Sequence, residues 1–398
     1  MAGKPATADR SDLLRRVGEM RTERASWMAH WAELSRYFLP RNGRFFLQDR
    51  NKGHRRHNAI YDNTGTRAVR VLAAGLQSGM TSPARPWLRL ATPDPKLNGS
   101  HAVKVWLDDV TRVMLAIFRK SNFYQALHQG YGELGVFGTD AMVYQEDYHT
   151  VMHLANLTVG EFAVATDWKG RVNTLVREFE RPVAEVVAEF GRENVSQTVR
   201  TLFDRGTLGA WVPITHIIEP RADREPGSRL AKDMPWRSIY FERGAGPEYT
   251  LRDGGYKDFP VICSRWDVAG GDIYGNSPAM EALGDVKQLQ QQQLRKGQGI
   301  DYMTRPALAL PPSMKNSDAD LLPGGQNYTD GTEQVRPMWQ PNLRLDHLLE
   351  DMRDVRERVK ASFYVDMFLM LSEMGEARMT ATEVAERHQE KLLMLGPT

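Results

Sequence analysis

The sequence predicts an α+β fold, and three features of its periodicity and composition support that class. Apolar residues recur at three- and four-residue steps in several long stretches, which is the spacing of one face of an α-helix. Between residues 140 and 180 the period changes to two, which indicates an antiparallel sheet. A Pro- and Gly-rich stretch at residues 305–341 separates two long helical patterns. We therefore expect one α+β body over residues 1–271, followed by two helical rods that flank a compact excursion.

Length and composition limit the classes of protein to consider. The chain has 398 residues, of which 41% are hydrophobic and 26% charged, as in ordinary soluble globular proteins of two or three structural units. The best membrane-span candidate, residues 363–371, is short and contains Asp366, so no membrane partner is expected. The single cysteine, Cys263, excludes an intrachain disulfide and fits a reducing site of synthesis. The net charge is +2, so a polyanionic partner must be met by locally arranged charge.

Helices are expected in the first third of the chain at residues 11–39, 64–79, 101–119 and 123–135, with Pro40 ending the first. The residues expected to be buried on the first helix are Leu13, Leu14, Val17, Met20, Trp27, Trp31, Leu34 and Phe38. Those expected to be buried on the third are Val105, Trp106, Val110, Val113, Met114, Ile117 and Phe118.

The connections between these helices differ in character. Residues 41–56 are rich in arginine, and a solvated surface loop is favoured there over a nucleic-acid contact, because charge runs usually face water. Residues 82–90 predict a Pro-rich turn and a short strand.

Strands dominate the next part of the chain. They are expected near residues 142–144, 162–164 and 174–176, and again near 211–219, 237–241 and 261–266. Pro182 is expected to begin a helix that ends near Phe190. Cys263 falls in one of the apolar strands and is expected to be a small buried residue.

The first rod is expected to begin at Pro278, with Ser277 as its N-cap, and to run to Met303. Its apolar stripe consists of Ala279, Ala282, Leu283, Val286 and Leu289. After Leu289 the stripe thins into glutamines and basic residues, beginning at Gln290, so this part is not expected to be buried in a closed core. The whole helix would be roughly 39 Å long. Such a rod usually lies beside neighbouring subunits or lines a water-filled space.

The second rod is expected over residues 345–371, and its apolar residues repeat at close to heptad spacing. They are Leu345, Leu348, Met352, Val355, Val359, Phe363 and Phe368. The rod is expected to break near Ser372. Thr380 and Glu383 then form a capping box, which predicts a new helix that begins at Thr380.

No pattern in the sequence indicates catalysis, and no cofactor is expected. The chain has no phosphate-binding P-loop, no H-E-x-x-H zinc motif and no G-x-S-x-G nucleophile motif. His149 and His153 are four residues apart, but in a strand and turn this spacing does not place them on one face, so a metal site is not assigned. Gly270 and Gly271 precede a helix without the order of a dinucleotide fingerprint, which favours a tight turn.

Several stretches together resemble one protein family. They are Pro83–Leu90 after the second helix, Asp272–Pro278 followed by Leu283–Leu289, and Met379–Val384. In this order and spacing, over nearly the whole chain, they are similar to the portal (head-to-tail connector) proteins of short-tailed double-stranded DNA bacteriophages. The resemblance implies a ring, usually of twelve subunits, at one vertex of the capsid.

The resemblance also implies a division of the chain into the parts of the portal fold. A helical and β wing would occupy residues 1–271, and two stem helices, residues 272–304 and 342–371, would flank a small α/β clip at 305–341. Residues 372–379 would form a tunnel loop, and 380–398 the start of a long wing helix. Family chains continue into a crown, which is expected to be absent here because the sequence stops at Thr398.

Candidate site residues follow from the same resemblance. The tunnel loop would present Glu373, Met374, Gly375, Glu376 and Arg378 to DNA. Candidate channel charges on the first stem helix are Lys287, Arg295 and Lys296, although salt bridges between subunits would use them equally well. The clip residues that would contact the packaging motor or tail adaptor are Lys315, Asp318, Asp320, Arg336 and Trp339.

The function implied is a channel for packaging and ejection of double-stranded DNA. The partners would be terminase, a tail adaptor, and the major capsid and scaffolding proteins, in a virion component assembled in the host cytoplasm. One alternative is a capsid scaffold or interaction protein without a DNA channel. The other is a nucleic-acid motor or nuclease subunit, which the missing P-loop and the missing carboxylate pair or metal cluster disfavour.

Overall fold

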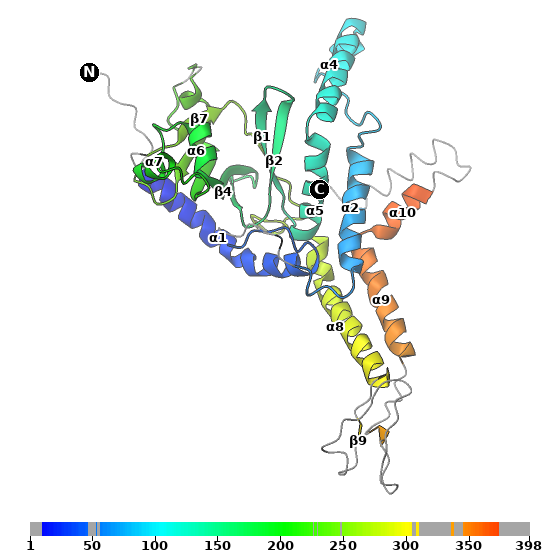
Figure 1. Cartoon of the computed structure of the whole chain (residues 1–398). Coiled ribbons are helices and arrows are strands. Elements are labelled where there is room, and N and C mark those ends of the chain that lie inside the picture. The colour runs from blue at the N-terminus through cyan, green and yellow to red at the C-terminus, as the bar shows by residue number, and fades with distance from the viewer. Residues whose placement is uncertain are drawn as a thin grey trace.

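The structure, a computed structural model, describes residues 10–46, 53, 56–225, 227–228, 230–246, 249–304, 308–309, 336–337 and 345–373. Its helices are α1 (Arg10–Tyr37), α2 (Thr64–Met80), α3 (Pro95–Gly99), α4 (His101–Lys120), α5 (Phe123–Phe137), α6 (Val183–Phe190), α7 (Gln197–Asp204), the 3-10 turn η1 (Ala231–Asp233), α8 (Pro278–Thr304), α9 (Asp346–Ser362) and α10 (Val365–Glu373). Its strands are β1 (Ala141–Asp147), β2 (Val151–Leu157), β3 (Phe162–Thr166), β4 (Val172–Pro182), β5 (Trp211–Pro220), β6 (Trp236–Glu242), β7 (Arg252–Tyr256), β8 (Val261–Ile262), β9 (Leu308–Ala309) and β10 (Arg336–Pro337). A mixed α and β body lies in the middle, with α4 projecting from one end and α8 with α9 from the other (Figure 1).

The larger sheet is antiparallel, with strand order β3-β4-β5-β6-β7. Alternate residues of its strands pack on opposite faces. Val176 lies opposite Ile217, and both pack toward α1 with Val17. Their neighbours Leu175 and Ile218 belong to the main core on the other face. The period-two pattern at residues 174–176 therefore belongs to an antiparallel strand, as predicted, and this strand is buried on both faces.

The sheet expected between residues 140 and 180 is in fact split into two. β1 and β2 join β8 in a separate three-stranded sheet, because Met142 and Val143 pair with Ile262 and Val261. The expected strand over 261–266 is correspondingly short, and Cys263, just after it, is partly buried against the main core. Burial raises the pKa of its thiol. Pairing partners far away along the chain decided this division.

Several elements of the body differ from the sequence-based expectations. β2, β7 and α7 were not expected; α7 is short, and β7 contains two glycines that lower its strand propensity. Residues 82–90, all described, form a turn without a strand. Helices α1, α2, α5 and α6 begin and end within two residues of the expected positions.

The predicted buried face of α4 is right only toward its C-terminal end, where Ile117 and Phe118 pack against a buried cluster. The buried residues are Leu107, Thr111 and Leu115, whereas Trp106 is 63% exposed. Val105 and Val113 are exposed as well, and so is Leu14 on α1. The apolar pattern predicts only that a face can be buried. Because α4 projects beyond the sheets (Figure 1), no part of the described chain covers Val105, Trp106 and Val113.

The start of α8 agrees with the prediction. Ser277 is its N-cap, since the amide of Met280 donates to the Ser277 hydroxyl oxygen at 3.2 Å. The Ser277 hydroxyl in turn donates to the carbonyl of Val136 at 2.8 Å, which ties the cap to α5. The five residues of the predicted stripe are all buried, namely Ala279, Ala282, Leu283, Val286 and Leu289.

The expected second rod, residues 345–371, is not one continuous helix. α9 ends at Ser362 and α10 begins at Val365, and between them Tyr364 has a φ of +55°, in the left-handed region. The break places Phe363 in the main core, with its ring centroid 5.6 Å from that of Phe38. α10 then ends at Glu373, one residue after the break expected near Ser372.

The direction of α10 depends on a close approach to α2. The ring of Phe368 lies over Gly75, where a Cβ atom would overlap it. A glycine in a helix interior is unfavourable by about 1 kcal/mol relative to alanine. At Gly75 this loss of helix propensity is offset by the close packing of Phe368.

We expect Gly75→Ala to destabilise the chain by about 1–3 kcal/mol, because Phe368 must leave its position or α10 must shift. Gly284→Ala is the control: it lies in α8 with no atom within 4 Å of an added Cβ, and should be neutral or stabilising by up to about 1 kcal/mol. Thermal melting of both variants checks this. Equal melting temperatures for Gly75→Ala and the unchanged chain would contradict the packing.

Candidate functional site: the projecting helix pair

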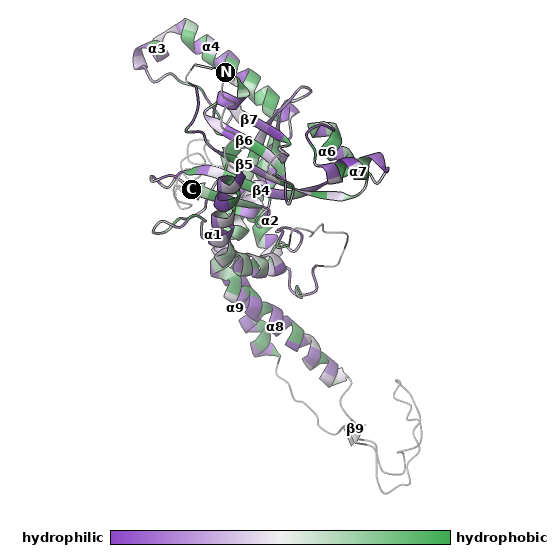
Figure 2. Ribbon diagram, turned by 90° about the vertical axis from the view of Figure 1, so that its left-hand side faces the viewer, coloured by the Kyte–Doolittle hydropathy of each residue, from purple (hydrophilic) through white to green (hydrophobic). Residues whose placement is uncertain are grey.

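α8 and α9 lie side by side and antiparallel, and together they extend away from the body in both views (Figures 1 and 2). Hydrophilic and hydrophobic residues alternate along both helices (Figure 2). Beyond their ends, Leu308–Ala309 pairs antiparallel with Arg336–Pro337. This pair lies within the Pro- and Gly-rich excursion. The rods therefore do not fold back into a closed interior.

An apolar seam holds the two helices to each other and to the body. Val286 and Leu289 of α8 are buried together with Met352, Val355 and Val359 of α9. The cluster continues into α1, α2 and α5, so the upper half of the pair belongs to the main core. Each such side chain contributes about 1.5–3 kcal/mol when it is fully buried.

Gln290 anchors α8 to the loop before α2, although the sequence placed it on the exposed polar part of the helix. Its side chain is 5% exposed. Its Oε1 accepts hydrogen bonds from the amides of Tyr61 at 2.6 Å and Asp62 at 2.8 Å, and its Nε2 donates to the Asp62 carbonyl at 2.9 Å. A buried amide with three such partners fixes the position of the loop.

Asp62 connects this loop to both α2 and α9. Its Oδ1 accepts from the amide of Thr64 at 2.9 Å, at the start of α2. Its Oδ2 accepts from Arg356 Nε at 3.1 Å and Nη2 at 2.8 Å. Partial burial alone would raise the pKa of Asp62, but the hydrogen bonds from Thr64 and Arg356 outweigh it and the pKa lies below its ordinary value. The ionised carboxylate is thus the form that the fold stabilises.

Polar contacts also run along the exposed side of the pair. Arg358 Nη2 of α9 lies 3.1 Å from Asp285 Oδ1 of α8, and Gln288 Nε2 donates to Asp351 Oδ2 at 3.3 Å. These groups are exposed, and surface ion pairs of this kind contribute about 0–1 kcal/mol each. They align the two helices more than they stabilise them.

The three candidate channel charges lie on α8 but differ in their surroundings. Lys287 forms an ion pair with Glu33 of α1, within the chain. Arg295 is exposed and Lys296 half-buried, further along α8, and neither has an ion-pair partner among the residues described. The sequence did not indicate the pairing of Lys287, because Glu33 is far away along the chain.

The remaining candidate residues are not tested by the structure. Met374, Gly375, Glu376 and Arg378, the clip residues Lys315, Asp318, Asp320 and Trp339, and the capping box at Thr380 lie outside the described residues. For Glu373 and Arg336 only the backbone is described, in α10 and β10.

The described residues contain no group of three or more His, Cys, Asp or Glu side chains that could hold a metal ion. His149 lies in the β1–β2 turn, where its amide donates to Asp147 Oδ1 at 2.6 Å. Gly270 and Gly271 both have positive φ, as a tight turn requires. No helix in the described part of the chain has the length and apolarity needed to cross a membrane.

Comparison with known proteins places the chain among phage proteins. Residues 10–398 match the family described as "Bacteriophage head to tail connecting protein". The chain is 59% identical over 392 residues to a "Probable portal protein" of Bordetella phage BPP-1, covering 98% of this chain and 71% of the relative. It is 41% identical over 396 residues to the "Portal protein" of Salmonella phage epsilon15, with the same two coverages.

Solved structures similar to the chain come from gene transfer agent (GTA) particles. The neck of an empty GTA particle matches with a TM-score of 0.38 at 12% identity, over 77% of this chain and 66% of that one. The virion of a native GTA particle matches with a TM-score of 0.38 at 11% identity, over 86% of this chain and 72% of that one.

We expect Asp62→Asn to destabilise the chain by about 1.5 kcal/mol at neutral pH, because Arg356 loses a charged acceptor. The lowered pKa of Asp62 means that the carboxylate stabilises the fold above its ordinary pKa of 3.8, and that this contribution is lost as the pH falls through the lower folded-state value.

The difference in melting temperature between Asp62→Asn and the unchanged chain should therefore shrink as the pH is lowered from about 6 to below about 4. Asp351→Asn is the matched control, since Asp351 is exposed and accepts hydrogen bonds from Gln288 and Gln292, and it should change stability by less than about 0.5 kcal/mol. A constant difference across this pH range would contradict the role given to the Asp62 charge.

Proposed function

The chain belongs to the family of bacteriophage head-to-tail connecting, or portal, proteins, and from this premise we propose that its copies form a ring whose axial channel passes double-stranded DNA. The family is structural and non-enzymatic, and the chain is a component of the virion portal. Packaging and ejection of the genome would both use the same channel.

The observation that carries this proposal is the projecting pair of α8 and α9. Two helices that project from the body with uncovered outer faces are typical of a subunit in an assembly and not of a monomer. Ile300 and Tyr302, near the free end of α8, are 41% and 56% exposed. Copies placed around an axis would set these rods side by side, and their outer faces would then meet neighbours or the channel.

The charges on α8 suit passage of DNA rather than tight binding. Double-stranded DNA carries one charge per about 1.7 Å of its axis, so a continuous basic wall would retain it. α8 instead carries three acidic and three basic residues: Glu281, Asp285, Asp301, Lys287, Arg295 and Lys296. With Lys287 paired to Glu33, the candidate channel charges reduce to Arg295 and Lys296.

We expect the division of the chain to follow the family pattern. Residues 1–271 would be the wing, and α8 with α9 the stem. Residues 305–341 would be a clip that docks terminase during packaging and a tail adaptor afterwards, through Lys315, Asp318, Asp320, Arg336 and Trp339. The tunnel loop would then follow α10, at residues 374–379, which is later than Ser372 because α10 extends through Glu373.

Exposed apolar residues on α4 also favour an assembly. Trp106, Val105 and Val113 would remain in water on a lone subunit, and contiguous exposed apolar surface usually marks an interaction site. The other partners of the portal, the major capsid and scaffolding proteins, would have to approach the outer side of the ring.

Negative-stain images and native mass spectrometry of the purified full chain test the ring. We expect closed rings of identical subunits with an open axial hole. A mass equal to one subunit at high concentration would overturn the proposal. Closed particles without an axial hole would favour a scaffold or capsid-interaction protein instead.

Replacing Arg378 by Glu in the phage tests the tunnel loop. One arginine per subunit becomes a circle of positive charge in a ring, and reversing it would repel the DNA backbone. We expect a severalfold lower yield of full heads, with shortened genomes, when packaged DNA is sized on a gel. Arg15→Glu, at an exposed position of α1, is the control; normal full heads from Arg378→Glu would count against a DNA-facing loop.

A further inference from the structure

The turn between β3 and β4 presents a tryptophan to solvent. Trp168 is 89% exposed, although tryptophan side chains are usually buried over much of their large apolar surface. The ammonium of Lys169 lies 5.0 Å from its ring centroid, and most of the ring faces water. Tryptophan is among the residues most enriched at the energetically important positions of protein interfaces. The turn is therefore a candidate contact surface, separate from the projecting helix pair.

The backbone around this tryptophan is held in place by several hydrogen bonds. Asp167 Oδ1 accepts from the amides of Lys169 at 2.8 Å and Arg171 at 2.9 Å. Gly170 has a φ of +74°, which suits glycine, and its carbonyl accepts from the guanidinium of Arg265. A turn that is already ordered loses little backbone freedom when its exposed side chain binds a partner.

A pocket of about 450 Å³ lies near the other end of β4, between α6 and the larger sheet. The rings that line this aromatic pocket belong to Phe179 of β4, Phe190 of α6 and Tyr240 of β6. The turn precedes β4 and α6 follows it directly, and the 11 residues of β4 span about 36 Å at about 3.3 Å each. Trp168 and the aromatic pocket therefore lie on different sides of the body. Figure 2 shows α6 and α7 projecting on the side of the pocket.

Flat π-faces make up much of the aromatic pocket. The guanidinium of Arg177 lies 4.3 Å from the ring centroid of Phe179. His216 stacks on Tyr240, with 3.7 Å between the ring centroids and 8° between the planes. Burial lowers the pKa of His216 well below its ordinary value, so its imidazole is neutral beneath the tyrosine ring. Surfaces of this kind stack with a further aromatic ring, and tryptophan brings the largest one.

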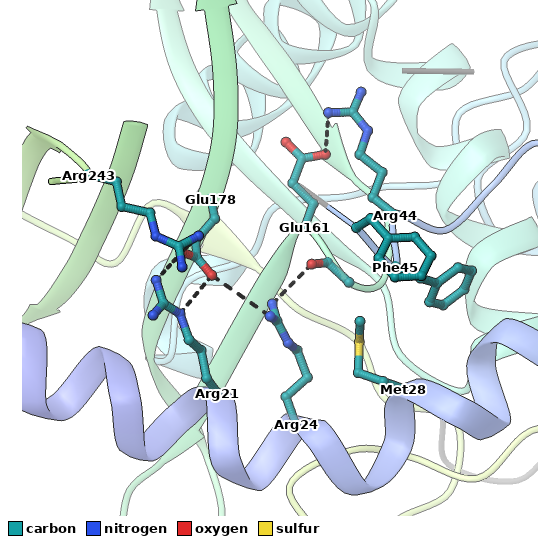
Figure 3. A pocket seen from close by; sticks show the side chains of 10 residues that line it. Arg21, Arg24, Met28, Arg44, Phe45, Glu161, Glu178 and Arg243 are labelled. Atoms are coloured by element: carbon teal, nitrogen blue, oxygen red, sulfur yellow. Dashed lines mark hydrogen bonds and ion pairs between the residues drawn. The ribbon is translucent and has the colours of Figure 1, made fainter. Parts of the chain in front are cut away.

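The arginines on both faces of the larger sheet are already paired, which disfavours a phosphate ligand. Arg177 Nε donates to Glu161 Oε1 at 2.8 Å. In the smaller pocket under α1, Arg21 Nε donates to Glu178 Oε2 at 2.9 Å, and Arg44 Nη1 lies 3.6 Å from Glu161 Oε2 (Figure 3). Binding of a nucleic-acid backbone requires positive charge that is free to neutralise phosphates. The aromatic pocket is better suited to an apolar side chain.

Opposite charges accompany Trp168 and the aromatic pocket. Lys169 follows Trp168 in the turn and forms no ion pair with the residues that the structure describes. The side chain of Glu185, at the rim of the pocket, is 60% exposed. Its Oε2 lies 3.6 Å from Arg181 Nη1, which is too far for a good hydrogen bond. The Glu185 carboxylate can therefore accept a hydrogen bond from an ammonium that approaches the rim.

We propose that the aromatic pocket receives Trp168 of a second copy of the chain, the next subunit of the ring; this inference rests on the ring proposed above. In a head-to-tail ring each copy places one surface against a different surface of the next copy. One chain carries both halves of this contact at opposite ends of β4, so every copy can insert its tryptophan into one neighbour and receive that of the other. Lys169 would then stand beside Glu185, and this charge pair would favour the correct alignment of the two subunits.

The first test measures the stability of rings formed by the full chain with Trp168→Ala. We expect these rings to dissociate at a protein concentration about tenfold higher than rings of the unchanged chain, because each interface loses a buried aromatic anchor. Trp168→Phe should retain most of the stability. Tyr148→Ala is the matched control: Tyr148 is a fully exposed aromatic residue in the β1–β2 turn, and its loss should change nothing. Native mass spectrometry follows dissociation, and thermal melting verifies that each subunit is folded.

The second test fills the aromatic pocket from its own chain. Ala188 lies at an exposed position of α6 and lines the pocket, so Ala188→Trp should block it without disturbing the core. We expect the same loss of ring stability as with Trp168→Ala. The two substitutions combined in one chain should weaken the ring no further, because both remove one contact. Additive losses would overturn the proposal.

The third test identifies the occupant by chemical coupling. Chains with Trp168→Cys are mixed with chains with Ala188→Cys, assembled into rings and treated with a short bismaleimide. We expect coupled peptides that contain residues 168 and 188, which in this mixture can arise only between two copies. Rings of the unchanged chain, whose single cysteine is Cys263, give the background. Intact mixed rings without coupling between residues 168 and 188 would contradict the contact.

The outcomes separate the two proposals. If the unchanged chain forms no ring, the proposed function fails before the aromatic pocket is tested. If it forms rings and Trp168→Ala rings are equally stable, only the contact proposed for Trp168 is overturned. If those equally stable rings fail to enter phage heads, Trp168 contacts another virion protein, and the proposal of a second copy is also wrong.

Discussion

The junction at which Asp62 meets Gln290 and Arg356 is the contact on which the shape of the molecule depends. It brings the start of α2, the middle of α8 and the middle of α9 together through hydrogen bonds between 2.6 and 3.1 Å. Apolar packing alone is non-directional and would allow the two helices to slide or rotate. Buried polar groups with defined partners fix one arrangement, because each would be costly if left unpaired.

The part of α8 after Gln290 and the part of α9 before Met352 can project, because the rest of both helices is packed firmly against the body. Buried side chains end with Leu289 and Gln290 on α8, except for Gly299, and with Met352 on α9 nearest the tip. Beyond these residues the helices are supported by each other. The break at Tyr364 completes the anchor: it places Phe363 against Phe38 and turns α10 back onto α2. The body therefore holds α9 from the side and at its end.

The described surface of one subunit exposes large apolar side chains that contacts between subunits in a ring would cover. Trp106 on α4 is exposed, and Tyr302 is exposed near the end of α8. These two residues lie on different parts of the molecule, as a head-to-tail assembly with several contact regions would require. Apolar contacts supply most of the association energy in such interfaces, whereas charged pockets set the register.

The sequence by itself determined the features that depend on neighbours along the chain. The Ser277–Pro278 start of α8, its buried stripe, the strands of period two and the motifs that resemble portal proteins all follow from residues close together in sequence. The tertiary structure alone decided that Gln290 is buried, that Trp106 is not, that Lys287 pairs with Glu33 and that the second rod breaks at Tyr364. The periodicity of apolar residues predicts which side chains can share one face of a helix or strand. Whether that face is buried depends on contacts with residues that can lie hundreds of positions away in the sequence.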